Sequence, residues 1–248
     1  MSTHPFVICL SGFDPCGGAG ILADIKTLEM YQVQGLGVCT ALTFQNEHSF
    51  SGVEWISEET IFRQLSVLLD SYQPKAIKIG IVENLQVLKR IVSYLHDNLA
   101  DTPLILDPVL RATAGYDFHK KIDSQALNEI LLTIDLLTPN LDESEQLFGT
   151  TDPKLIAERS ACPVLLKGGH ADSEFATDLL IENGTTHLFQ HEKKSGFSKH
   201  GTGCILSAAI AANLALGKSL PDSCRFAKEY MQAILTSNHT KLAYHYEP

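Results

Sequence analysis

The segment from Lys199 to Cys204 has the residue types and spacing of an anion-binding turn. It reads Lys-His-Gly-Thr-Gly-Cys, and Gly201, Thr202 and Gly203 stand directly before an apolar, helix-like run. Several backbone N–H groups can converge at such a turn, and the dipole of the following helix favours negative charge there. This suits phosphoryl transfer, in which a protein mainly positions groups and stabilises charge. The same residues could instead simply cap a buried helix.

Cys204 falls in the first turn of that expected helix, where a thiolate is stabilised. We therefore expect it to accept the proton of an attacking hydroxyl group. A rival interpretation is a thiol enzyme in which Cys204 is a covalent nucleophile and His200 its base. That scheme gives no role to the Gly-rich and acidic segments elsewhere in the chain. A third reading is that Cys204 only packs.

A second Gly-rich segment, residues 12–20, follows the first expected strand and opens a helix. It contains neither the dinucleotide fingerprint nor the Gly-Lys-Ser/Thr of a P-loop, which argues against an NAD-type oxidoreductase. Asp24 on the new helix could bond an amino-substituted ring, although a solvated helix residue is the simpler reading. Thr43 and Gln45 end the second strand with groups that could contact a heterocycle edge or merely form a turn.

Oxygen ligands follow two further strands. Asp107 ends the run Leu-Ile-Leu, and Asn140 and Glu143 follow Leu-Thr-Pro. Mg²⁺ is usually held by one or two carboxylates, waters and substrate phosphates, so these residues are candidate magnesium ligands. Asn140 and Glu143 also fit a helix capping box. Lys167 ends another strand and could contact a nucleotide phosphate or be an exposed lysine, and His170 is given no catalytic role.

The elements that must position these residues alternate between strand-like and helix-like runs. Asn183-Gly184 predicts a hairpin turn, and Gly217 predicts the end of a helix. The alternation predicts one α/β domain over residues 1–248 with a mostly parallel sheet, whose ligands bind beyond the carboxyl ends of the strands. The expected strands are 6–10, 38–44, 53–56, 76–81, 104–106, 136–138, 164–167, 176–181 and 187–189, and the expected helices are 19–33, 61–69, 85–95, 122–132, 202–216 and one after Pro221.

Composition limits the remaining function classes. The 248 residues are 44% hydrophobic and carry a net charge of -10, which fits a globular enzyme and argues against nucleic acid as a partner. The start lacks a basic region, and its apolar run is too short for a signal peptide or a membrane anchor. The six cysteines are scattered, without metal-type pairing, which indicates a reducing compartment. We therefore expect a cytoplasmic protein that has no membrane as a partner.

Taken in order, the segments resemble the hydroxymethylpyrimidine and phosphomethylpyrimidine kinases of thiamine biosynthesis, a branch of the ribokinase superfamily. The resemblance covers nearly the whole chain and rests on SGFDPCGGAGILADIKT, TALTFQN, KIGI, LDPV, TPNLDE, LLKGGH and HGTGC. It implies a three-layer α/β/α fold and ATP- and Mg²⁺-dependent phosphorylation of 4-amino-5-hydroxymethyl-2-methylpyrimidine and then of its monophosphate. It also admits a homodimer.

The resemblance implies residue roles as well. Gly201, Thr202, Gly203 and Cys204 would form the anion hole, with Cys204 near the substrate hydroxyl. Asp107 and Glu143 would organise Mg²⁺, and Lys167, Asn140 and Thr202 would contact ATP. The pyrimidine pocket would be lined by Gly12, Ala19, Asp24, Thr43, Gln45, Ile81 and Val109, with Asp24 and Gln45 bonding a ring nitrogen and the exocyclic amine.

Two departures from the family pattern bear on the substrate. Residues 111–117 replace the usual Ala-Lys-Ser-Gly stretch in an expected flap, and Ile81 stands where methionine is common. Both could favour a different ring, so a pyridoxal or pyridoxine kinase with the same machinery remains the alternative. A non-catalytic vitamin or nucleotide sensor is a further reading, against which Cys204 and the carboxylates argue.

Overall fold

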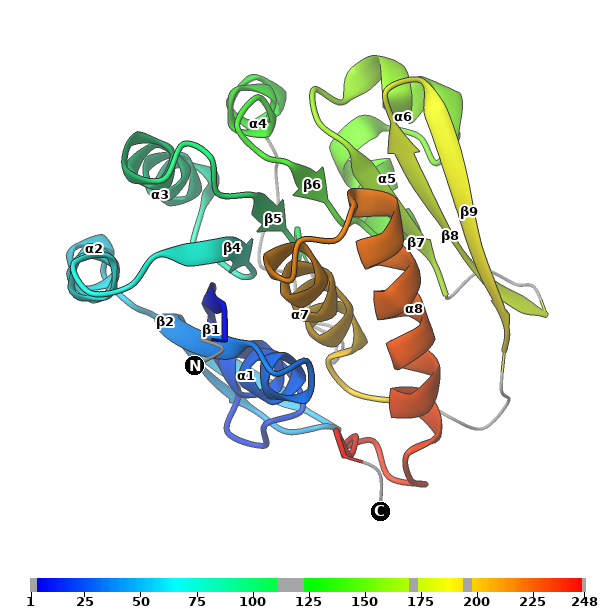
Figure 1. Ribbon diagram of the computed structural model, residues 1–248, viewed down its shortest axis with the longest axis horizontal. Helices are drawn as coiled ribbons and strands as arrows, with labels where there is room; N and C mark the ends of the chain where they lie inside the picture. Colours follow the sequence, from blue (N-terminus) through cyan, green and yellow to red (C-terminus); the bar gives the residue numbers. More distant parts are fainter. Residues whose placement is uncertain (1–3, 111–122, 170–173, 194–197, 247–248) are drawn as a thin grey trace.

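The computed structural model describes residues 4–110, 123–169, 174–193 and 198–246, in which strands and helices alternate (Figure 1). Its strands are β1 Phe6–Phe13, β2 Gln34–Gln45, β3 Phe50–Trp55, β4 Pro74–Ile79, β5 Leu104–Leu106, β6 Leu136–Leu137, β7 Val164–Gly168, β8 Phe175–Glu182 and β9 Thr185–Glu192. Its helices are α1 Gly20–Met30, α2 Glu58–Leu69, α3 Leu85–Asn98, α4 Ser124–Leu131, α5 Leu141–Phe148, α6 Pro153–Arg159, α7 Thr202–Ala215 and α8 Leu220–Thr236.

All of these strands join one sheet, in the order β3-β2-β1-β4-β5-β6-β7-β8-β9. The strands from β2 to β7 in this order pair in parallel, whereas β3, β8 and β9 each pair antiparallel to their neighbours. The chain moves from β1 to β2 on one side and returns to β4 on the other. Strand order therefore reverses at β1, and a crevice forms at such a switch point beyond the carboxyl ends of the strands.

Helices cover both faces of the sheet, because successive side chains of a buried strand point to opposite faces. In β1, Ile8 and Leu10 pack in a core with α2, α3 and α4, whereas Val7 and Cys9 pack with α1, α7 and α8. The arrangement confirms the predicted three-layer α/β/α class. No helix in the described part of the chain has the length and apolar character needed to cross a membrane.

Most expected elements are present, with shifted ends. The hairpin across Asn183-Gly184 is confirmed, and Gly217 follows α7 with a positive φ of 80°. Strand β2 begins four residues earlier than expected. Gly35 has no side chain to mark the strand in the sequence, and Ile25 and Leu28 of α1 fill the space that a side chain there would take. Helix α6 was not predicted, although Asp152 caps it and Pro153 opens it.

Candidate active site

A cavity of about 920 Å³ lies at the carboxyl ends of the parallel strands. This volume is in the range that holds small ligands. It brings together segments from most of the chain, as the switch-point topology requires. The predicted site residues that line it are Gly12, Ala19, Thr43, Gln45, Ile81, Asp107, Val109, Asn140, Glu143, Lys167, Gly201, Thr202, Gly203 and Cys204. Asp24 is the predicted site residue that is missing from this lining.

The turn at residues 201–204, which the sequence predicts to bind an anion, opens α7 as expected. Gly201 is the N-cap of α7 with φ +76°, a left-handed conformation that glycine adopts without strain. A Cβ added at Gly201 would lie 2.0 Å from the carbonyl oxygen of Gly18, so the turn packs directly against the loop after β1. The first N–H groups of α7 are unpaired within the helix and open on the cavity. Residues 201–204 therefore present a positive helix end to a ligand.

The environment of Cys204 differs from the prediction. Burial raises the pKa of the Cys204 thiol to about 11. Lys78 and the Gly20 N–H act in the opposite direction, and Asp24 and Asp107 add to the increase. The expected thiolate stabilisation at the helix start is therefore wrong for the free protein, because desolvation outweighs the pKa-lowering effects of Lys78 and the Gly20 N–H. Cys204 is a neutral thiol near pH 7.

Asp24 lies beneath the cavity rather than in its wall. Its carboxylate is fully buried and pairs with the equally buried Lys78, whose Nζ lies 2.9 Å from Asp24 Oδ2, while Ser11 Oγ donates to the same oxygen at 2.7 Å. Burial opposes the charge on Lys78, but the adjacent Asp24 outweighs it and raises the Lys78 pKa. The prediction that Asp24 bonds the substrate ring is therefore corrected. Ser11 is the member of this group that reaches the cavity.

Lys167 and two carboxylates form a second charged group, this one in the cavity wall. Lys167 Nζ lies 2.9 Å from Asp107 Oδ1 and 3.9 Å from Glu143 Oε2. Burial opposes ionisation of Asp107, but Lys167 and Lys78 hold its pKa below the usual value. A Cβ at Gly203 would lie 3.4 Å from both Lys167 Nζ and Asp107 Oδ2, which places this group beside the anion-binding turn.

Asn140 and Glu143 form the capping box of α5, which the sequence predicted as the alternative to a role in ligand binding. Asn140 Oδ1 accepts from the Glu143 N–H at 2.8 Å, and Glu143 Oε2 accepts from the Asn140 N–H at 2.7 Å. Burial and the nearby Asp107 raise the pKa of Glu143 to about 7, although Lys167 opposes them. The cap does not exclude a ligand role, because both side chains still line the cavity.

The cavity extends over β8, β9 and α8, beyond the predicted residues. Lys228 of α8 donates to Asp178 Oδ2 at 2.7 Å, and Asp178 Oδ1 accepts from the Gly168 N–H. Apolar side chains of Met231 and Leu235 complete this end of the wall. The cavity thus extends from the end of β2, past residues 201–204, to α8.

Sequence similarity shows which family this chain belongs to. A family model described as phosphomethylpyrimidine kinase matches residues 14–248. The chain belongs to this family. A hydroxymethylpyrimidine/phosphomethylpyrimidine kinase of Aquifex aeolicus is 32% identical over 250 residues, covering 97% of each chain. The family predicted from the motifs, and the phosphotransferase class with it, are confirmed.

Solved structures of related kinases share the fold. Bacillus subtilis pyridoxal kinase, in an ADP complex, has a TM-score of 0.85 and 27% identity, covering 95% of this chain and 93% of that one. Phosphomethylpyrimidine kinase from Clostridium difficile has a TM-score of 0.77 and 29% identity, covering 93% and 98%. Vitamin kinases acting on two different rings therefore share the frame of this phosphomethylpyrimidine kinase family member.

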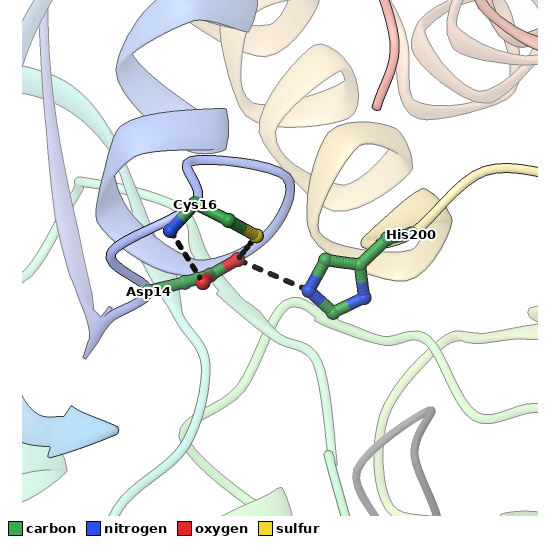
Figure 2. A group of neighbouring side chains, drawn as sticks. All are labelled: Asp14, Cys16 and His200. Atoms are coloured by element: carbon green, nitrogen blue, oxygen red, sulfur yellow. Dashed lines mark hydrogen bonds and ion pairs between the residues drawn. The ribbon is translucent and has the colours of Figure 1, made fainter. Parts of the chain in front are cut away.

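Sequence reasoning missed the partners of two buried side chains of this family member. One is Lys78, whose place in the apolar run of β4 was a usable signal, since a lysine inside a buried strand must have a partner. The other is His200, whose Nε2 lies 3.0 Å from Asp14 Oδ2 and joins the two Gly-rich segments (Figure 2). No spacing in the sequence connects residues so far apart. The flap expected at residues 111–117 lies outside the described residues.

Proposed function

We propose that the protein is an ATP-dependent kinase of 4-amino-5-hydroxymethyl-2-methylpyrimidine and of its monophosphate, formed by a single domain over residues 1–248. The observation that carries this proposal is that one cavity is lined both by the anion-binding turn with Cys204 and by Thr43 and Gln45, whose polar groups would contact the edge of the substrate ring. Family membership and the name of the Aquifex aeolicus relative support the substrate. Cysteines that are all free thiols support a cytoplasmic location, and a homodimer remains a prediction.

The ring would lie between Ile81 and the end of β2. Ile81 packs against Gly12, where a Cβ would lie 2.5 Å from its Cδ1. Gln45 donates its amide N–H to Thr43 Oγ1 at 2.9 Å, which leaves its Oε1 to accept from the exocyclic amine of an aminopyrimidine. Pyridoxal has no such amine. The free acceptor on Gln45 therefore favours the pyrimidine as substrate. Pyridoxal is the second candidate, because the chain shares its fold with a pyridoxal kinase.

Phosphoryl transfer would occur at the N-terminus of α7. The N–H groups of residues 201–204 would bind the oxygens of the transferred phosphoryl group, and Lys167 would balance charge beside them. Cys204 would take the hydroxyl proton as the new oxygen–phosphorus bond forms, a step that needs its thiolate. The rival covalent mechanism needs the same thiolate and, in addition, a base beside it. His200, whose Nε2 is engaged by Asp14, is not a base for Cys204.

Mg²⁺ fits the donors present beside Lys167. Asp107 and Glu143 offer carboxylate oxygens of the kind that this hard ion prefers, and the high pKa of Glu143 indicates a site where added positive charge is favourable. Glu143, with Asp107, would hold the ion, which would supply charge neutralisation for the ATP phosphates. Asn140 Oδ1 is engaged by the Glu143 N–H, and the Nδ2 amide group of Asn140 would be the one that donates to an ATP phosphate.

A substrate panel tests the proposal. The protein is incubated with MgATP and, separately, with the hydroxymethylpyrimidine, its monophosphate, pyridoxine or pyridoxal, and ADP release is measured. We expect turnover with both pyrimidines. Turnover confined to pyridoxine and pyridoxal would replace the proposal with the second candidate. A lack of turnover with any of them would favour a sensor.

Removal of the thiol at position 204 should slow turnover without abolishing nucleotide binding. We expect Cys204→Ala to lower kcat by about 10²-fold, the contribution typical of a general base, and to leave the affinity for ATP unchanged. Because the pKa of Cys204 is about 11, kcat of the native protein should rise with pH above neutrality, and this rise should disappear in the variant. Cys39→Ala, which alters a half-buried thiol outside the cavity lining, is the control.

Glu143 should make nucleotide binding depend on pH. Its pKa of about 7 means that a rise from about pH 6 to pH 8 ionises the carboxyl group. We therefore expect the affinity for MgATP to increase over that range. ATP titrates near the same pH, so Glu143→Gln, measured with the same nucleotide, is the control. An equally steep pH dependence in this variant would remove Glu143 from metal binding.

A further inference from the structure

Two loops bring three different metal-binding side chains together beside the active site. Asp14 and Cys16 follow β1, and His200 precedes α7 (Figure 2). His200 Nε2 lies 3.0 Å and Cys16 Sγ 3.2 Å from the same atom, Asp14 Oδ2. All three ligand atoms lie within 4.8 Å of one another, the only such His/Cys/Asp/Glu group among the described residues.

The geometry of this cluster is close to that of a metal site. A tetrahedral zinc ion at about 2.0–2.3 Å from its ligands separates them by little more than the two distances from Cys16 and His200 to Asp14 Oδ2. The contacts from Cys16 and His200 to Asp14 Oδ2 are hydrogen bonds whose protons an ion can replace, since the sulfur and nitrogen atoms then become ligands. The Ala19 N–H also donates to this oxygen, at 2.9 Å, and orients the carboxylate. Asp14 and His200 are buried, so the ligands are held in place. Cys16 is half-exposed, which gives an ion a route in.

The donor set selects the class of ion. One carboxylate, one imidazole and one thiolate form a mixed O, N and S set that suits Zn²⁺ and not Mg²⁺, which prefers oxygen alone. Glu47 lies close enough to act electrostatically on Cys16, and its negative charge adds to that of Asp14. Three protein ligands leave the fourth zinc position for water.

We propose that Asp14 Oδ2, Cys16 Sγ and His200 Nε2 form a binding site for one Zn²⁺ ion, separate from the magnesium ligands of the reaction. Binding releases the Cys16 thiol proton to solvent and leaves the imidazole neutral, with its proton on Nδ1. The site does not depend on the identity of the phosphorylated ring.

The ion would link two loops that already pack tightly. A Cβ at Gly18 would lie 2.6 Å from His200 Cδ2, and the neighbouring Ala19 and Gly201 both line the active-site cavity. A bond from each loop to one ion therefore joins the loop after β1 to the anion-binding turn. Since unfolding would break the site, binding should stabilise the folded protein.

Cobalt is a spectroscopic probe for this site. Reduced, untagged protein is titrated with Co²⁺ in excess Mg²⁺, and sulfur-to-cobalt charge-transfer absorption is recorded. We expect one Co²⁺ per chain with this absorption, its displacement by Zn²⁺, and a higher melting temperature in Zn²⁺. Cys16→Ser should lose the absorption and the shift in melting temperature. Cys39→Ser, another half-buried thiol, should retain both.

Two variants separate metal binding from the stability of the fold. Serine at position 16 can still donate to Asp14, so the fold should persist and circular dichroism should be unchanged. His200→Asn, which removes the nitrogen ligand, should weaken Co²⁺ binding at least tenfold. Absence of the absorption in the native protein, or its persistence in Cys16→Ser, would overturn the proposal.

Discussion

Replacing Lys78 with methionine should lower the free energy of unfolding by about 3–5 kcal/mol, the cost of leaving one partner of a buried ion pair alone. Lys78 and Asp24 are both fully buried, and Nζ lies 2.9 Å from Oδ2. Methionine has a similar length but no charge, so the Asp24 carboxylate would be left with Ser11 alone. Chemical denaturation monitored by circular dichroism measures the change.

Two further variants separate the ion pair from the loss of packing. In Lys78→Met with Asp24→Asn neither charge of this buried pair remains, and we expect much of the lost stability to return. Lys89→Met, which breaks an exposed ion pair with Glu129, should leave the denaturation midpoint nearly unchanged. If the double variant is no more stable than Lys78→Met, the ion pair is not what stabilises this part of the fold.

Replacing Gly201 with alanine should lower kcat by about 10²-fold or more, comparable to the loss of one donor from an oxyanion hole. The added Cβ would meet the Gly18 carbonyl oxygen at 2.0 Å, so the turn must move away from the loop after β1. The N–H groups at the start of α7 then no longer converge on the cavity. Steady-state kinetics with MgATP measures the effect.

Gly217 supplies the matched control. It has φ +80°, close to the +76° of Gly201, but nothing lies within 4 Å of an added Cβ. Gly217→Ala should therefore show the backbone strain, roughly 1–2 kcal/mol of stability, and keep its kcat. An equal loss of kcat in both variants would mean that strain, and not the position of the anion-binding turn, accounts for the result at Gly201.

The sequence predicted the fold class because buried parallel strands and the helices between them leave strong local patterns. The apolar runs that became β1, β4, β5 and β7 were found, as was the turn that opens α7. Errors fell where a local signal is weak or overridden. The glycines at the start of β2 obscure a strand that α1 covers, and α6 is too short for a periodic pattern.

The sequence by itself determined which loops end at the cavity, because parallel strands place their carboxyl ends at one edge of the sheet. Only the tertiary structure decided what each side chain there contacts. It paired Asp24 with Lys78 away from the cavity, joined Asp14 to His200, and placed Cys204 where desolvation raises the pKa of its thiol. Burial and charge pairing depend on neighbours that are distant in the chain, and no local pattern encodes them.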